Sequence, residues 1–180
     1  MRVIAGKYKG IPLQTPTGLQ TRPTLDRVKE ALFSILQFDL VGRVVLDLFA
    51  GSGALGIEAL SRGAAHCHFV DHNRKAIEVI RSNLSKCKAE DNFTLTHASA
   101  EEYLTNQNDV YDIIFLDPPY KEANYLSWIE RLQQHQRLAK DAIIVIECHR
   151  KDEPVFVREF EGKTYHYGDK SLIVLKRKIG

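Results

Sequence analysis

The glycine-rich turn near residue 50 constrains the fold of this chain more than any other feature of its sequence. An apolar run leads into the turn and an amphipathic stretch follows it, so that residues 45–56 read VLDLFAGSGALG. In an open parallel sheet, such a strand–turn–helix unit places its turn at the carboxyl ends of the strands, where ligands bind. Glycine lets the backbone approach a ligand that a side chain would keep away. The turn thus predicts an α/β fold and the position of a binding site.

Short apolar runs and amphipathic stretches alternate along the rest of the chain. Strands are expected at Val44–Phe49, Cys67–Asp71, Phe93–His97, Ile113–Asp117 and Ile143–Cys148, and helices at Ala54–Arg62, Arg74–Lys86, Glu101–Asn106 and Asn124–Leu138. This alternation predicts βαβ units and therefore a parallel sheet with helices on both faces. The last two runs, Val155–Phe160 and Leu172–Lys176, have no helix between them. The predicted fold is α/β and Rossmann-like, a mostly parallel sheet with an antiparallel C-terminal edge hairpin and a small N-terminal extension.

The N-terminal part of the chain is basic, although the whole protein of 180 residues has a formal net charge of only +2. Residues 1–29 contain six Lys or Arg residues and one acid, Asp26. A basic segment on a mildly acidic body is typical of a local contact with an anionic partner, although a solvated basic edge explains the charge equally well. We expect a single domain over residues 1–180, made of a basic extension at 1–23 and a Rossmann-like core at 24–180.

Neither a membrane protein nor a secreted protein is expected. The longest uninterrupted apolar run, Ala142–Ile146, has five residues, whereas a membrane helix needs roughly 20. The N-terminus lacks the apolar segment of a signal peptide. Cys67, Cys87 and Cys148 form no CxxC pair, which is typical of a reducing compartment. We therefore expect a cytoplasmic protein, and no pattern calls for an obligate protein partner.

Two acidic residues narrow the class of ligand that the turn can bind. Gly51, Gly53 and Gly56 fit the dinucleotide fingerprint GxGxxG, which is weak evidence alone. Asp47, just before the turn, would repel a pyrophosphate but suits a ligand with an amino group, so it argues against a nicotinamide-dependent oxidoreductase. Asp71 ends the next expected strand, where a carboxylate can bind ribose hydroxyls. It could instead cap the helix that follows.

A second motif, Asp117-Pro118-Pro119-Tyr120, follows the expected strand at Ile113–Asp117. The Asp117 carboxylate and the Pro118 carbonyl form a pair of acceptors that can take both hydrogens of an exocyclic amine and aim its lone pair at a methyl group. The prolines stiffen the turn and bring no competing N–H, and Tyr120 offers a ring for an extruded base. A strand-ending turn with an aromatic plug is the structural alternative.

Together, these two motifs resemble those of the S-adenosylmethionine-dependent methyltransferases of Rossmann type. The opening MRVIAGKYKG, residues 22–33 (RPTLDRVKEALF) and residues 167–172 (YGDKSL) further resemble the bacterial RsmD family, which methylates the N2 amine of a guanine in 16S ribosomal RNA. The resemblance covers nearly the whole chain. It implies S-adenosylmethionine as methyl donor, S-adenosylhomocysteine as product, and 16S ribosomal RNA, within a small-subunit particle, as partner.

The resemblance also implies roles for individual residues. The cofactor-binding residues would be Asp47, Phe49, Ala50, Gly51, Gly53, Asp71, Ser99 and Ala100, with the last two beside the adenine. Many relatives have Asp or Asn where this chain has Ser99. The catalytic residues would be Asp117, Pro118, Pro119 and Tyr120, and the RNA-binding residues Arg2, Lys7, Lys9, Arg22 and Tyr120, the basic ones through phosphates.

Besides the oxidoreductase, two other hypotheses are kept beside this one. Methylation of the N6 amine of adenine in DNA uses the same tetrapeptide, although so short a chain has no separate DNA-reading domain. A non-enzymatic RNA-binding module could retain the fold without catalysis. His66-Cys67-His68 suggests a metal site, but strand alternation separates Cys67 from the two histidines and no second ligand cluster follows, so we expect no metal.

Overall fold

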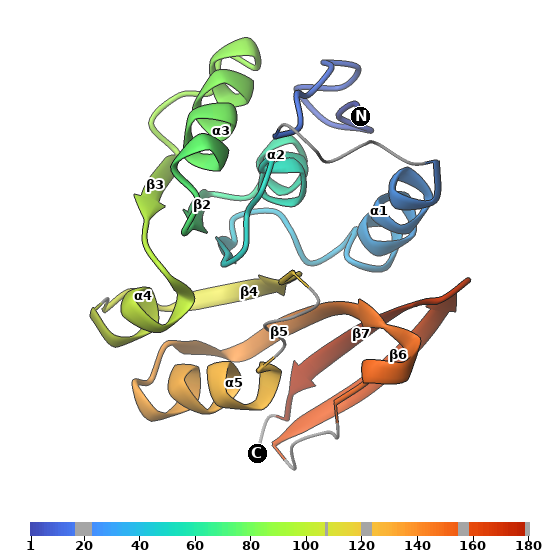
Figure 1. Ribbon diagram of the computed structural model, residues 1–180, viewed down its shortest axis with the longest axis vertical. Helices are drawn as coiled ribbons and strands as arrows, with labels where there is room; N and C mark the ends of the chain where they lie inside the picture. The colour runs from blue at the N-terminus through green and yellow to red at the C-terminus, as the bar shows by residue number, and fades with distance from the viewer. Residues whose placement is uncertain (17–22, 107, 120–123, 155–158, 179–180) are drawn as a thin grey trace.

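The computed structural model describes residues 1–16, 23–106, 108–119, 124–154 and 159–178, and within them the strands form a single sheet of seven. The strands are β1 (Val44–Asp47), β2 (His66–Asp71), β3 (Phe93–His97), β4 (Tyr111–Leu116), β5 (Leu138–His149), β6 (Phe160–Tyr167) and β7 (Lys170–Arg177). Their order in the sheet is β3-β2-β1-β4-β5-β7-β6 (Figure 1). β1 to β5 are parallel, whereas β7 pairs antiparallel with both β5 and β6. The predicted fold class is thereby confirmed.

Helices cover both faces of the sheet. They are α1 (Pro23–Ile35), α2 (Ala54–Ser61), α3 (Arg74–Lys86), α4 (Ala100–Asn106) and α5 (Tyr125–Gln134), with a 3₁₀ turn η2 at Arg150–Asp152. Figure 1 shows α1, α2 and α3 on one side of the strands and α4 and α5 on the other. Successive side chains of a strand point to opposite faces. Accordingly, Phe115 packs in the core under α1 to α3, and its neighbour Ile114 packs in the core under α4 and α5.

Glycines shape the turn and let the helix after it pack closely on the sheet. Gly53 directly precedes α2 and has a φ of 80°, a left-handed conformation that glycine adopts without strain. Gly56 lies in the first turn of α2, and a Cβ there would be 2.3 Å from Phe69 and 2.6 Å from the sulfur of Cys67 on β2. The missing side chain at Gly56 therefore allows α2 to lie directly on β2.

The N-terminal segment is held against α2 by hydrogen bonds. Glu58 of α2 accepts hydrogen bonds from the backbone N–H groups of Ile4, at 2.8 Å, and Ala5, at 3.1 Å. The same carboxylate pairs with Lys29 of α1 at 3.1 Å and with Arg62 at 2.9 Å. One buried acid thus ties the N-terminal segment to two helices.

Several element boundaries differ from those predicted. The helix expected at Asn124–Leu138 ends at Gln134, because Gln136 has a φ of 53° and turns the chain into β5. β5 therefore begins at Leu138, earlier than the expected Ile143. The strand expected at Val155–Phe160 falls mostly on residues 155–158, which lie outside the described ranges. The strand that pairs with β7 is β6, at Phe160–Tyr167. As an edge strand, β6 is held by main-chain bonds to β7 and does not need an alternating apolar pattern.

Among the described residues, none of the helices combines the length and the apolarity that a membrane crossing would require.

Candidate active site

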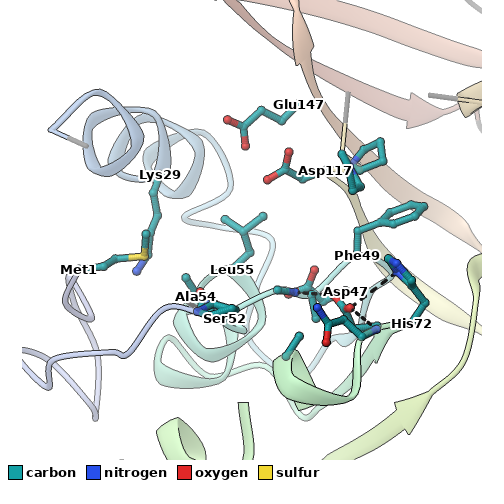
Figure 2. A pocket seen from close by; sticks show the side chains of 18 of the residues that line it. Met1, Lys29, Asp47, Phe49, Ser52, Ala54, Leu55, His72, Asp117 and Glu147 are labelled. Atoms are coloured by element: carbon teal, nitrogen blue, oxygen red, sulfur yellow. Dashed lines mark hydrogen bonds and ion pairs between the residues drawn. The ribbon is translucent and has the colours of Figure 1, made fainter. Parts of the chain in front are cut away.

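A cavity of about 520 Å³ opens at the carboxyl ends of β1, β2 and β4, next to the glycine turn (Figure 2). The predicted site residues that line it are Asp47, Phe49, Ala50, Gly51, Asp71, Asp117, Pro118 and Pro119. It is also lined by Met1, Lys29, Leu55, His72 and Glu147, which the sequence did not single out. The two motifs, 61 residues apart at Gly56 and Asp117, therefore meet at one cavity.

Asp47 is the buried acid of this cavity. It ends β1 with a side chain only 2% exposed, and its carboxylate accepts a hydrogen bond of 3.2 Å from the backbone N–H of Gly56. Burial raises the pKa of this carboxyl to about 7, against the opposing effect of the Gly56 hydrogen bond, and the charge of Asp71 adds to the rise. A ligand with a cationic amino group would favour the ionised form of Asp47 and so offset the effect of burial on its pKa.

Asp71 ends β2 on the other side of the glycine turn. Its carboxylate accepts one hydrogen bond from the N–H of Gly51, at 2.9 Å, and another from the N–H of Asn73, at 2.8 Å. Each carboxylate oxygen can accept more than one hydrogen bond, so both retain capacity for ligand hydroxyls. The alternative role as a helix cap falls to Asn73, whose side chain accepts from the N–H of Lys75 at the start of α3.

A second cavity of about 270 Å³ adjoins the first and shares Phe49 and His72 with it. The predicted residues Ser99 and Ala100 line this second cavity, together with Ala98, Glu101 and Trp128. The ring of Phe49 lies 4.6 Å from that of Trp128, which forms an aromatic wall. The Ser99 hydroxyl accepts a hydrogen bond of 3.1 Å from the N–H of Glu102 and so caps α4. That hydroxyl is therefore engaged within the protein.

Asp117 directly follows β4 and faces an acid that the sequence analysis missed. Glu147 of β5 lines the same cavity, and Figure 2 shows both carboxyl groups pointing into the open space beside α1. Burial raises the pKa of Asp117 well above its ordinary value, the charge of Glu147 raises it further, and Lys170 opposes both. The signal for Glu147 was its position: it is the one acid that interrupts the apolar run from Ile143 to Cys148.

The remaining predicted residues either do not line the two cavities or lie outside the described ranges. Gly53 shapes the turn without lining the cavity. Arg2, Lys7 and Lys9 are exposed on the N-terminal segment. Arg2 donates a hydrogen bond to the Gly10 carbonyl at 3.0 Å, and Lys7 lies over the Tyr8 ring. Arg22 and Tyr120 fall outside the described residues.

The histidines of β2 have the alternation that the sequence predicted. The rings of His66 and His68 lie 4.6 Å apart on one face of the sheet, whereas Cys67 is fully buried on the other. His66 is hydrogen-bonded to the Thr94 hydroxyl at 2.8 Å. In the part of the chain that the structure describes, no group of three or more His, Cys, Asp or Glu residues is arranged to hold a metal ion.

Comparison with known proteins identifies the family. A family model described as "Conserved hypothetical protein 95" matches residues 1–176. A Bacillus subtilis protein named "Putative rRNA methyltransferase YlbH" is 43% identical over 156 residues, which cover 85% of each chain. "Ribosomal RNA small subunit methyltransferase D" of Escherichia coli is 37% identical over 147 residues, which cover 82% of this chain and 74% of the relative. The chain belongs to the RsmD family.

Solved structures agree with the RsmD assignment. The structure described as "Putative methyltransferase yhhF from Escherichia coli" has a TM-score of 0.89 and 32% identity, covering 100% of this chain and 99% of that one. At 16% identity, SMU.776, which was solved complexed with SAH, shares the fold with a TM-score of 0.70 over 87% of this chain and 50% of its own. This member of the RsmD family is a methyltransferase, and the oxidoreductase alternative is set aside.

Proposed function

We propose that this chain transfers the methyl group of S-adenosylmethionine to the N2 amine of a guanine in 16S ribosomal RNA, within a small-subunit particle. The observation that carries this proposal is that Asp117 and Pro118 open into the same cavity as the glycine turn. The names of the E. coli and B. subtilis relatives support an RNA substrate. We propose that the protein acts in the cytoplasm as a single domain of residues 1–180, with residues 1–23 as a basic extension.

The residues of the two adjoining cavities fit this cofactor. Asp47 is a buried carboxyl that accepts a hydrogen bond from the backbone N–H of Gly56, and it suits the methionine ammonium. Ala50, Gly51 and Gly53 would shape the wall around the methionine part. We assign the ribose hydroxyls to Asp71. The adenine is assigned to the second cavity, between Phe49 and the loop at Ser99 and Ala100. When bound, S-adenosylmethionine would supply an electrophilic methyl group for transfer to the amine.

The protein contributes to the reaction by positioning the amine and by stabilising the transition state electrostatically. An exocyclic amine is a weak nucleophile because its lone pair is delocalised into the base. Asp117 and the Pro118 carbonyl would each accept a hydrogen bond from one N–H of the amine, and Pro119 would stiffen the turn that carries these two acceptors. The amine is then fixed for in-line attack on the methyl group. After transfer, the nitrogen carries an extra proton. Asp117 suits its removal, because burial raises the pKa of this carboxyl and makes its ionised form a stronger proton acceptor.

The RNA would approach across the basic N-terminal segment. Arg2, Lys7 and Lys9 are exposed there, and Met1 of the same segment lines the cavity. We propose that these side chains, with Arg22, contact phosphates and supply salt-dependent affinity that is independent of sequence. Tyr120 would stack on the extruded base.

The test of this function is transfer of a labelled methyl group. Purified protein and methyl-labelled S-adenosylmethionine are offered to unmodified small ribosomal subunits, to their naked RNA and to unmethylated duplex DNA, and each is digested to nucleosides. Label in N2-methylguanosine from a ribosomal sample is the expected result. Label in N6-methyladenine from DNA would replace the substrate with the adenine alternative, and binding of cofactor without any label would favour the non-enzymatic module.

Cofactor affinity should depend on pH through Asp47. The pKa of this carboxyl is about 7, and only its ionised form can pair with the ammonium group. The affinity for S-adenosylhomocysteine should therefore fall about tenfold as the pH is lowered from about 8 to about 6. Titration calorimetry at both pH values measures this change. An Asp47→Asn variant should bind weakly at both, and a wild-type affinity that is equal at both would contradict the assignment.

A further inference from the structure

Glu147 lies one strand away from Asp117 and faces the same cavity. The pairing of Leu116 on β4 with Ile146 on β5 brings the next residue of each strand, Asp117 and Glu147, alongside one another. Both line the cavity, and Glu147 is 12% exposed. On its other side, the ammonium group of Lys170 lies 3.9 Å from the Glu147 carboxylate. An acid so placed is beside whatever base offers its amine to Asp117.

The carboxylate of Glu147 keeps hydrogen-bonding capacity for a ligand. The contact with Lys170 is longer than a hydrogen bond, and the Tyr125 hydroxyl donates to the backbone carbonyl of Glu147 and not to its side chain. The Glu147 side chain is hydrogen-bonded to Asp117. A carboxyl group has several acceptor sites, so this one bond leaves room for a ligand donor. The ammonium group of Lys170 complements the charge of a carboxylate at this position, and a carboxylate can only accept hydrogen bonds. The group beside the reacting amine must therefore be a hydrogen-bond donor.

Guanine and adenine differ at the ring position next to the amine. In guanine, the N1–H donor is adjacent to the N2 amine, whereas in adenine the N1 lone pair is adjacent to the N6 amine. An ionised carboxylate accepts a hydrogen bond from the N1–H of guanine and repels the N1 lone pair of adenine. Asp117 and Pro118 treat both amines alike, since they contact only the amine hydrogens. Selection between the two bases therefore needs a further group.

We propose that Glu147 is the residue that selects guanine, by accepting the N1–H hydrogen bond while Asp117 and the Pro118 carbonyl hold the N2 amine. This inference rests on the proposed function and assigns its base specificity to one side chain. It makes Glu147 a substrate-contacting residue on β5, 30 residues after the Asp117 motif. Lys170 acts through Glu147, whose carboxylate its ammonium group faces at 3.9 Å.

A base analogue tests this assignment directly. 2-Aminopurine has the same amine at C2 as guanine but has a lone pair at N1 instead of N1–H. The target guanine is first mapped with the labelled-methyl assay, and small subunits are then reconstituted with RNA that carries guanine or 2-aminopurine at that position. The rate constants kcat/KM are measured for both substrates with the wild type and with Glu147→Gln. Glu161→Gln, an exposed change on β6, is the matched control.

The wild type should prefer guanine by about 100-fold, the effect of one hydrogen bond to a charged group. In Glu147→Gln this preference should fall below about tenfold, because the side-chain amide can donate to the N1 lone pair. Affinity for S-adenosylhomocysteine and the melting temperature should stay those of the wild type. Equal losses on both substrates, an unchanged preference, or a wild type that methylates 2-aminopurine as fast as guanine would each overturn the proposal. Labelling of the guanine substrate by the wild type is established beforehand, so such a result concerns Glu147 and not the proposed function.

Discussion

Replacing Asp117 with alanine should lower methyl transfer by about 10³-fold without loss of cofactor binding. The reason is that the carboxylate is one of the two acceptors that hold the amine, and removal of one preorganised hydrogen-bonding group from an active site costs about 10²–10³ in rate. Asp117 lies beside Glu147 at the end of β4 and not at the glycine turn. Single-turnover transfer of labelled methyl and calorimetric binding of S-adenosylhomocysteine measure the two effects separately.

Folding should not limit this variant. Because burial and Glu147 hold the pKa of Asp117 above its ordinary value, the ionised carboxylate is less favourable in the folded protein than in the unfolded chain. Its removal should therefore leave the melting temperature unchanged or raise it. Asp91→Ala, at an exposed position after α3, is the control and should retain full activity. An Asp117→Ala enzyme with more than about a tenth of wild-type activity would show that the amine is held by other groups.

The parts of the fold that local physics determines could be predicted from the sequence. β1 to β5 are short buried runs between amphipathic helices, and both features arise from side-chain periodicity alone. The glycine turn was predictable because its backbone conformation favours glycine at Gly53, and packing against Phe69 requires glycine at Gly56. The edge strand β6 was not predictable, because half of its eight residues are exposed and only pairing with β7 defines its ends.

Some residues of the candidate site could likewise be predicted from the sequence, whereas others could not. Asp47, Asp71 and Asp117 each end a parallel strand, so topology alone brings them to one edge of the sheet. Glu147 belongs to the same edge, but only the pairing of β4 with β5 brings it beside Asp117. The capping role of the Ser99 hydroxyl likewise depends on where α4 begins, since Glu102 is the donor. Contacts between elements, and not patterns within them, were what the sequence could not provide.

The contacts of Glu58 join separate elements and could not be predicted from the sequence. Their loss is expected to have the largest effect on the stability of the protein. Glu58→Ala should lower the free energy of unfolding by about 3–5 kcal/mol, the usual cost of leaving a buried charge without its partner. Lys29 is 4% exposed and Glu58 fully buried, so solvent cannot replace the lost contact. The N–H groups of Ile4 and Ala5 would lose their acceptor as well. Urea unfolding at neutral pH measures the change.

The loss of stability in Glu58→Ala should also depend on pH, in a direction set by the pKa of Glu58. Burial would raise the pKa of Glu58, but the hydrogen bonds from Ile4 and Arg62 and the charge of Lys29 outweigh it and hold this pKa below its ordinary value. A carboxyl whose pKa is lowered by folding contributes its full stabilisation at any pH above its pKa in the unfolded chain. This stabilisation is lost as the pH falls through the lower pKa of the folded protein. The difference between wild type and Glu58→Ala should therefore shrink in acid.

Two controls separate the ion pair from the loss of a side chain. Glu78→Ala, at an exposed position of α3, should change stability by no more than about 0.5 kcal/mol. Combining Lys29→Met with Glu58→Gln removes both charges and keeps an acceptor for the N-terminal segment, so the double variant should be more stable than Glu58→Ala. A loss below about 1 kcal/mol in Glu58→Ala would mean that the N-terminal segment is held in place by its apolar contacts alone, with Val3, Tyr8 and Leu13 in the core.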